Sequence, residues 1–116
     1  MKRGDVAYAN LAPRSGSEQQ GHRPVIVVSH DGFNRTPSWR SIIVIPVSTS
    51  GKQALRGPTA VLLPVGAGGL REASVALCHQ VTTLDRAKLD MSVVAPIDGG
   101  LVELFDGCLF HCRAPA

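Results

Sequence analysis

The sequence is poor in aromatic rings and in charged side chains. Aromatic residues make up 4% of the chain and charged residues 18%, against roughly 25% charged in an average domain. So few rings argue against a surface that stacks several bases at once. The 44% apolar share argues against a disordered tail or an acidic adaptor. The aromatic residues are Tyr8, Phe33, Trp39, Phe105 and Phe110.

Long apolar stretches are also missing. The longest clean runs are Val25–Val28 and Ile42–Val47, far below the ~20 residues that a membrane-spanning helix needs. At the N-terminus, Asp5 and Asn10 interrupt what would be the apolar part of a secretory signal. We therefore expect a cytoplasmic protein in which residues 1–116 form a single domain.

Cysteine is scarce as well. The three cysteines are Cys78, Cys108 and Cys112, an odd number that does not make a disulfide framework. Cys108 and Cys112 could join His111 and His79 in a metal site, but one C-x3-C pair without a matching second pair is a weak zinc signal. Packing as small buried hydrophobes is favoured. No metal and no cofactor is expected.

The charge that is present has a bias. Lys and Arg outnumber Asp and Glu by 12 to 9, which gives a net charge of +3, and nine of the twelve cations are Arg. Arginine presents a planar fork of donors that suits phosphate. The bias is compatible with a polyanionic partner, although the net charge is too small to require one.

Short apolar or alternating segments predict a chain made mostly of strands. The polar stretch Ala12–Gly21 predicts a long loop, and loops of this length are often functional. His30–Arg40 predicts a turn with a short helical piece, and Asp85–Asp90 predicts one helical turn. The predicted strands are 4–11, 23–29, 41–47, 59–64, 74–81 and 91–97.

The C-terminal segment has a different period. Apolar residues recur from Leu101 to Cys112 with helical spacing, which predicts an amphipathic helix over Gly100–Cys112. Parallel βαβ units would need helices between the strands, and the sequence predicts only this one. We therefore expect a mostly β protein with a C-terminal α-helix, built as a small antiparallel barrel or curled sheet.

Two prolines predict features of the central strands, because proline has no backbone N–H to donate to a neighbouring strand. Pro24 is expected at the first position of its strand or on a sheet edge. Pro46 is expected to mark the end of its strand or a bulge.

Arg23 is the first candidate for chemistry. It stands at the start of a buried strand, after the polar segment Ser17-Glu18-Gln19-Gln20-Gly21-His22. A permanently charged guanidinium held by a rigid element can grip a phosphate or stabilise charge on a phosphorane. The residues alone favour a plainer interpretation, in which Arg23 is a surface cation paired with Glu18. His22, beside it, could titrate near neutral pH.

Ser48-Thr49-Ser50 and His79-Gln80 are the other candidates. Three hydroxyls after a strand can donate to a phosphate oxygen, although a turn that caps the strand is the more frequent role. A single histidine in a strand is usually satisfied by packing. No G-x-S-x-G motif and no matched carboxylate pair is present, which disfavours a serine hydrolase or a glycosidase.

Taken together, these segments resemble the MazF/PemK family of toxin endoribonucleases. The long S-E-Q-x-G-x-R-P and H-Q-x-x-T-L-D stretches make the likeness specific, and the matching motifs recur in order from residue 2 to about 90. They are Lys2-Arg3-Gly4-Asp5-Val6, Gly16-Ser17-Glu18-Gln19-Gln20-Gly21-His22-Arg23-Pro24-Val25, Asn34-Arg35, Ile45-Pro46-Val47-Ser48-Thr49-Ser50 and Cys78-His79-Gln80-Val81-Thr82-Thr83-Leu84-Asp85.

The resemblance implies an SH3-like barrel of the CcdB/PemK type, a homodimer, and sequence-specific, metal-independent cleavage of single-stranded RNA, including mRNA. A cognate acidic antitoxin of the MazE kind would restrain the activity. The RNA's own 2′-hydroxyl would attack the adjacent phosphorus and leave 2′,3′-cyclic phosphate and 5′-hydroxyl ends. These products need no activated side-chain nucleophile.

The resemblance also implies roles for single residues. Arg23 would be the principal catalytic residue, assisted by a hydroxyl from Ser48 or Thr49. The family commonly has a threonine where Ser48 stands. Some relatives have an acid at the position of His79 and an arginine at that of Leu77, so that part of their mechanism does not transfer here. The substrate-binding residues would be Ser17, Glu18, Gln19, His79 and Gln80.

Two alternatives remain at this point. A toxin of the same fold that binds DNA gyrase, as CcdB-like proteins do, would use the C-terminal helix rather than Arg23. A plain SH3-like binding module would carry out no chemistry.

Overall fold

The computed structural model describes residues 1–11, 22–49 and 60–97; for residues 91–94 it describes the backbone only. Within these ranges the chain is mostly β. The strands are β1 (Asp5–Asn10), β2 (His22–Val27), β3 (Ser41–Ser48), β4 (Ala60–Leu63), β5 (Ser74–Leu77), β6 (Thr82–Asp85) and β7 (Leu89–Pro96). The helical turns are α1 (Asp31–Asn34), η2 (Ala67–Gly69), η3 (Cys78–Gln80) and η4 (Arg86–Lys88).

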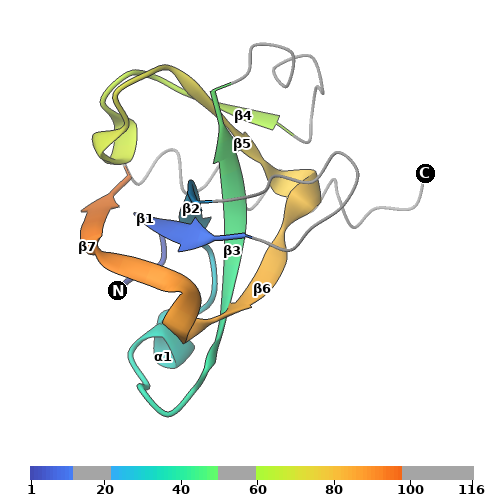
Figure 1. Ribbon diagram of the computed structural model, residues 1–116, viewed down its shortest axis with the longest axis vertical. Coiled ribbons are helices and arrows are strands. Elements are labelled where there is room, and N and C mark those ends of the chain that lie inside the picture. The colour runs from blue at the N-terminus through green and yellow to red at the C-terminus, as the bar shows by residue number, and fades with distance from the viewer. Residues whose placement is uncertain (12–21, 50–59, 98–116) are drawn as a thin grey trace.

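The strands form one antiparallel sheet in the order β4-β5-β3-β2-β1-β7, with β6 paired to β3 beside this path. Among the described strands the order does not close on itself, because β4 and β7 are its two ends. In Figure 1, β3 runs through the middle of the molecule. The hairpin of β4 and β5 lies at one end of it, and α1 lies at the other.

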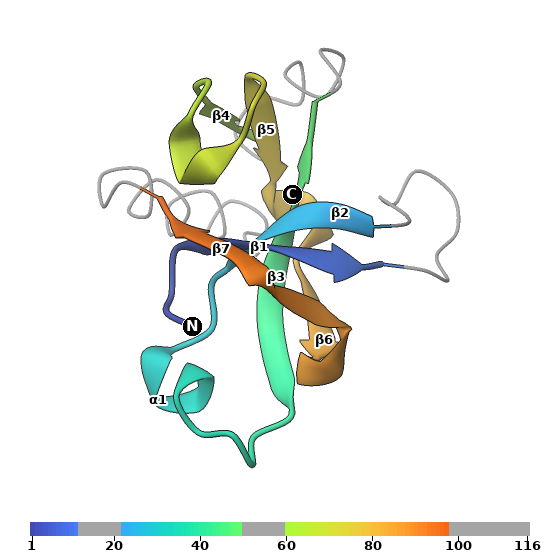
Figure 2. The same cartoon turned by 60° about the vertical axis from the view of Figure 1, so that its left-hand side comes forward.

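Both faces of the central strands are buried, as the continuous apolar runs predict. On β2, Ile26 packs into one apolar cluster while Val25 and Val27 pack into a second. On β3, Ile45 and Val47 join the first cluster, whereas Ile42 and Val44 join the second. Side chains alternate between the faces of a strand, so each central strand contributes to two cores. Figure 2 shows how the twisted sheet places β7, β1 and β2 across β3.

A buried polar cluster holds the turn at α1. Asn34 is only 3% exposed, and its Nδ2 donates to the carbonyl of Ser29 at 2.8 Å. The Ser29 hydroxyl donates to Asn34 Oδ1 at 2.5 Å, and Asp31 Oδ1 accepts from the backbone N–H of Arg3 at 2.7 Å. Because buried polar groups must be hydrogen-bonded, Asn34 is a structural member of the Asn34-Arg35 motif. The predicted turn with a short helical piece is confirmed.

Two sequence-based predictions after β4 are wrong in detail. The strand predicted over 74–81 ends at Leu77, and Cys78–Gln80 form the 3-10 turn η3. The strand β6 was not predicted, and only η4 remains of the helical turn expected over Asp85–Asp90. The reason is the path of the chain. It bends at η3 so that β6 can pair with the first half of β3, while β5 pairs with its last residues.

The two prolines sit where pairing is incomplete. Pro24 lies opposite Tyr8 of β1, in the part of β2 that precedes its register with β3 at Val25–Val27. Pro46 is interior to β3, so the prediction that it ends the strand is wrong. It lies where β3 changes neighbours, because the register with β6 ends at Val44 and that with β5 begins at Val47. The predicted helix over Gly100–Cys112 and the predicted loop Ala12–Gly21 lie outside the described residues.

Candidate active site

Arg23 is the second residue of β2 and lies opposite Ala9 of β1. Its side chain is exposed, while the residues that follow it, from Val25 to Val27, are fully buried. The strand therefore fixes the backbone of Arg23 and leaves the guanidinium at the surface. This is the position that the sequence predicts, at the entrance of a buried strand.

Ser48 ends the neighbouring strand β3, and the sheet register relates it to Arg23. Val25 pairs with Pro46 in an antiparallel ladder. Each step toward the N-terminus of β2 is matched by one toward the C-terminus of β3. The paired residues end at Val25 and Pro46, and continuing the same register by two residues would set Arg23 opposite Ser48. Ser48 is only 6% exposed and is held on its other side by pairing with Val75 of β5.

The alternation of side chains separates the two hydroxyls that follow one another in sequence. Residues two apart on a strand share a face, so Arg23 shares the face of Val25, and Ser48 shares that of Pro46. Because Val25 and Pro46 are cross-strand partners, Arg23 and Ser48 belong to one face of the sheet. Thr49 follows β3, is exposed, and belongs to the opposite face.

On that opposite face the surface is hollowed by a cavity of about 240 Å³. Thr49 lines it together with Tyr8 and Pro24, which face each other across β1 and β2. The remaining lining residues are Leu70, Arg71, Glu72 and Ser74, from the segment that leads into β5. This hollow brings an aromatic ring, a hydroxyl and both signs of charge together.

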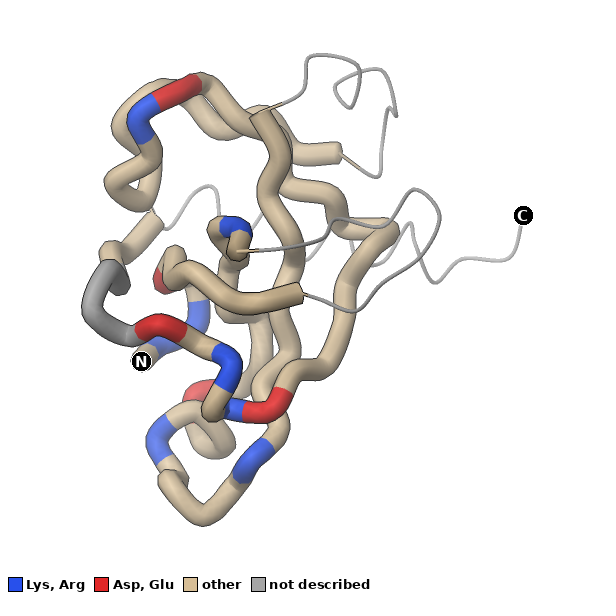
Figure 3. The backbone as a smooth tube through the Cα atoms, viewed as in Figure 1, with Lys and Arg blue, Asp and Glu red and all other residues tan. Residues whose placement is uncertain are grey.

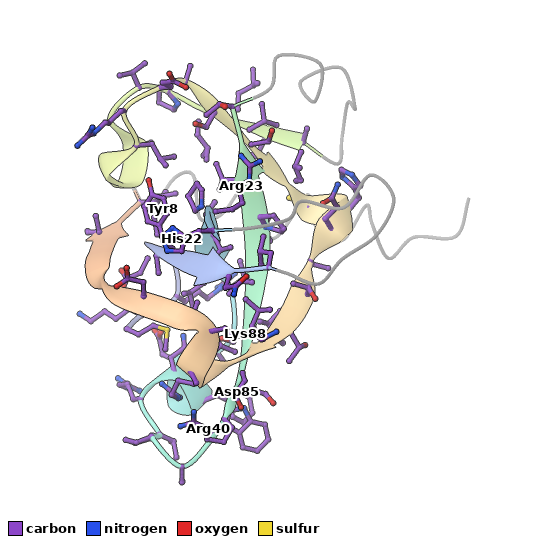
Figure 4. All side chains as sticks on the ribbon, viewed as in Figure 1. Tyr8, His22, Arg23, Arg40, Asp85 and Lys88 are labelled. Atoms are coloured by element: carbon purple, nitrogen blue, oxygen red, sulfur yellow. The ribbon has the colours of Figure 1, made fainter. Side chains whose placement is uncertain are left out.

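His22 borders the same face. Its ring stacks on Tyr8, with ring centroids 5.3 Å apart and planes 21° apart. The His22 Nε2 lies 4.0 Å from Asp90 Oδ2, and Asp90 is the cross-strand partner of Tyr8. Figure 4 shows Tyr8 and His22 side by side, with Arg23 beyond them. His22 and Arg23 are adjacent in sequence but occupy opposite faces of β2.

His79 and Gln80 lie in η3, directly after β5, rather than in a strand. Both side chains are partly buried, and Nε2 of Gln80 lies 3.4 Å from Nε2 of His79. Cys78, in the same turn, is fully buried and packs with Ile45 and Val47. This buried position fits the packing role favoured for Cys78.

Ser17, Glu18, Gln19 and Ser50 lie outside the described residues, as do Cys108 and Cys112. Within 1–11, 22–49 and 60–97, no group of three or more His, Cys, Asp or Glu side chains could hold a metal ion. No helix in this part of the chain is long and apolar enough to cross a membrane.

Sequence reasoning did not single out Tyr8, Asp90 or the segment from Leu70 to Glu72. One available signal is that Tyr8 is the only aromatic residue within the strands that the sequence predicts. Asp90 carries no such signal, since its place opposite Tyr8 depends on the pairing of β1 with β7.

Comparison with known proteins identifies the family of this small antiparallel protein. The family described as PemK-like, MazF-like toxin of type II toxin-antitoxin system matches residues 2–103. Endoribonuclease EndoA of Bacillus subtilis (strain 168) is 33% identical over 109 residues, covering 94% of this chain and 90% of its own. The chain therefore belongs to the PemK-like, MazF-like toxins of type II toxin-antitoxin systems.

Solved structures agree with this assignment. A crystal structure of MazF from Deinococcus radiodurans superposes with a TM-score of 0.76 at 25% identity, covering 96% of this chain and 94% of that one. A MazE-MazF complex from the same organism superposes with a TM-score of 0.71 at 25% identity, covering 96% of this chain and 93% of that one. The predicted family is confirmed, and its named relatives are endoribonucleases.

Proposed function

We propose that this protein is an endoribonuclease toxin that cleaves single-stranded RNA, including mRNA. Arg23 and Ser48 would carry out the reaction without a metal ion. Family membership supports the activity, because relatives across nearly the whole chain are named endoribonucleases. The observation that supports the site is the pairing of Val25 with Pro46, because alternation along β2 and β3 then assigns Arg23 and Ser48 to one face of the sheet. The named relatives are endoribonucleases, which favours the nuclease over the gyrase-binding or purely binding alternatives.

The reaction needs little from the protein beyond position and charge. The 2′-hydroxyl of the RNA attacks the adjacent phosphorus, the bond from phosphorus to the 5′-oxygen breaks, and a 2′,3′-cyclic phosphate forms. The 2′-hydroxyl loses its proton, and the departing 5′-oxygen gains one. The nucleophile belongs to the substrate, so the protein must stabilise the extra negative charge of the phosphorane and assist the proton transfers.

Arg23 supplies the charge. Its guanidinium carries several donors in a fixed plane, so it can bind two phosphorane oxygens at once. Ser48 can donate its hydroxyl to a phosphate oxygen from the neighbouring strand. Ser17, Glu18, Gln19, His79 and Gln80 are proposed to bind the RNA on either side of the reacting phosphate.

The proposed partner is an acidic antitoxin, as the MazE-MazF complex of the Deinococcus relative suggests. A partly disordered acidic segment that folds over the cationic site would occlude it. The affinity of the purified pair should fall as salt is raised from about 50 to 500 mM, because screening weakens surface charge pairs. An affinity that does not change with salt, measured by calorimetry, would contradict an acidic mimic of RNA.

The finer architecture is also a proposal. We infer that the sheet is part of an SH3-like barrel completed by a C-terminal helix over Gly100–Cys112, that two copies form a homodimer, and that the protein acts in the cytoplasm. The amphipathic pattern of that segment and the family membership support these inferences.

The deciding experiment compares wild type, Arg23→Ala and a matched control, Leu62→Ala, on a long RNA in the presence of EDTA. Leu62 is 65% exposed on β4, so its variant should fold and cleave as the wild type does. Arg23→Ala should lose at least ~100-fold in cleavage rate, as removal of an oxyanion donor does, while remaining folded and dimeric. Its expression should no longer arrest growth.

Intact RNA with the wild-type protein would remove the nuclease proposal altogether. A fully active Arg23→Ala variant would instead remove Arg23 from the mechanism. Primer extension on the same RNA then maps the sequence motif at which the protein cuts.

A further inference from the structure

Two of the few aromatic rings in this chain are paired on the surface. Phe33 of α1 and Trp39, which closely precedes β3, are 45% and 47% exposed. Their rings stack with centroids 4.7 Å apart and planes 28° apart. Trp39 is the only tryptophan of the sequence. Large aromatic side chains usually bury most of their area, so a stacked pair that is exposed indicates a surface that binds a ligand.

The backbone that carries the pair is held by one side chain, Arg86 of η4. Its Nε donates to the carbonyl of Trp39 at 3.0 Å, and its Nη2 donates to those of Phe33 and Thr36, each at 3.0 Å. Its Nη1 donates to the carbonyl of Asn34 at 3.1 Å. A single planar guanidinium thus fixes both ends of the loop 33–39, and the two rings are preorganised before any ligand binds.

The surroundings of the pair are cationic. The segments 31–40 and 85–88 carry four cations and two carboxylates, a surplus of two positive charges in a chain whose net charge is +3. Figure 3 shows these charged positions gathered at the end of the molecule that holds α1. Both carboxylates are engaged locally. Asp85 accepts from the backbone N–H of Ala87 at 2.8 Å and from Arg40 at 3.0 Å, which also occupies Arg40, and Asp31 accepts from the backbone N–H of Arg3 at 2.7 Å. The cations are Arg35, Arg40, Arg86 and Lys88.

We propose that the Phe33–Trp39 pair is a second RNA-contact site, which stacks one base of the single-stranded substrate outside the reacting nucleotides. Aromatic rings beside Arg and Lys are the features that bind single strands with little sequence preference, because every base has a face to stack and a phosphate beside it. The proposal rests on the proposed function, since that function supplies single-stranded RNA as the ligand.

Its place on the fold separates this site from the chemistry. The strand β3 begins two residues after Trp39 and ends at Ser48. At about 3.3 Å per residue, its eight residues place the two ends roughly 23 Å apart. In Figure 4, Arg40 and Asp85 lie near the end of the molecule that holds α1, away from Arg23. An RNA held at both places must run along the protein, so only long substrates gain from the second contact.

The first test uses Trp39 as an intrinsic probe in the unmodified full-length protein. A single-stranded 2′-O-methyl oligonucleotide of mixed sequence has no free 2′-hydroxyl and should remain uncut. It should quench Trp39 fluorescence saturably, and the midpoint should move to higher concentration as salt is raised. Absence of quenching at saturating oligonucleotide would overturn the proposal. So would emission that changes with protein concentration alone, because that result would mean that a second copy covers the rings.

The second test separates stacking from fold by kinetics. Trp39→Leu and Phe33→Leu should each raise KM about tenfold on a long RNA and leave kcat unchanged, the size expected for one base–ring stack. Trp39→Phe keeps a ring and should remain within about twofold of wild type. None of these substitutions should change KM or kcat for a short RNA that contains only the mapped cleavage motif. The exposed control Leu62→Ala should match wild type on both substrates.

The outcomes distinguish this proposal from the proposed function. If the oligonucleotide quenches Trp39 fluorescence but the protein cuts no RNA, the second binding site is supported and the proposed nuclease activity is refuted. If the wild-type protein cuts RNA but Trp39→Leu has the wild-type KM on long RNA, the nuclease activity is supported and the second site is refuted.

Discussion

Two neighbouring hydroxyls, Ser48 and Thr49, are given different surroundings by the sheet. Ser48 is buried, shares a face with Arg23 and pairs with Val75. Thr49 is exposed and lines the hollow with Tyr8 and Pro24. The sequence alone left open which hydroxyl serves the phosphate. Under the proposed function, the register of β2 with β3 favours Ser48, because a phosphate bound by Arg23 would lie on the side of the sheet that Ser48 shares.

Kinetics of Ser48→Ala and Thr49→Ala test this choice. Removing a donor aimed at the phosphorane should lower kcat by about 100-fold, so we expect that loss for Ser48→Ala. Thr49→Ala should change kcat by less than about fivefold, the difference being measured on one RNA under single-turnover conditions. A larger loss at Thr49 than at Ser48 would place the reacting phosphate on the other face. Ser48→Thr serves as a conservative control, because it keeps the hydroxyl.

At the scale of elements, one glycine decides how η2 fits beneath the sheet. Gly68 has φ +57°, which non-glycine residues seldom adopt. A Cβ there would lie only 2.3 Å from Val6 Cγ2 and 3.0 Å from Ile97 Cγ1. The backbone of η2 therefore packs directly on the first apolar cluster, to which Val6 and Ile97 belong.

Gly68→Ala should consequently destabilise the fold. We expect a loss of roughly 2–4 kcal/mol, combining the left-handed backbone with overpacking of a filled core. Gly66→Ala is the matched control. Gly66 also has a positive φ, +91°, but an added Cβ would meet nothing within 4 Å. Urea unfolding of both variants isolates the packing contribution, and equal losses would show that backbone strain alone matters.

The elements were predicted unevenly. The strands with apolar runs were found, because buried positions on both faces leave a clear pattern in β2 and β3. The strand β6 was missed since its four residues, Thr82–Asp85, include only one apolar side chain. The turn η3 was read as strand because Val75 to Val81 alternate, and alternation does not reveal a bend. Both features depend on tertiary structure, because β6 forms by pairing with the first half of β3 and η3 is the bend that brings it there.

At the scale of the whole molecule, two carboxylates couple folding to pH. The pKa of Asp31 is lowered, chiefly by the hydrogen bond that it accepts from the backbone N–H of Arg3; burial opposes this shift, and a weaker hydrogen bond from Asn34 adds to it. The pKa of Asp85 is lowered by the backbone N–H of Ala87 and by Arg40. The hydrogen bonds from Arg3 to Asp31 and from Arg40 to Asp85 favour the ionised carboxylates, and they join segments distant in sequence, Arg3 with α1 and Arg40 with the end of β6.

Stability should therefore fall in acid. In the unfolded chain these groups return to the ordinary aspartate value of 3.8. Their contribution is present above that pH and is lost as the pH falls through the lower values of the folded state. Urea midpoints measured from pH 6 to pH 2 should decline below about pH 4. Asp31→Asn should make the decline shallower; an unchanged slope would show that Asp31 does not contribute.

By itself, the sequence determined the family and the small mostly β fold, and it singled out Arg23 as the first candidate for chemistry. Motifs and buried apolar runs are local patterns of the sequence, so they can be recognised without knowing which strands pair. Only the tertiary structure decided which residues share a face of the sheet and which distant segments come into contact. The register of β2 on β3 sets Ser48 rather than Thr49 on the face of Arg23. The docking of η4 on the loop 33–39 fixes Phe33 against Trp39 through Arg86. These contacts join residues tens of positions apart, so strand pairing and chain path alone determine them.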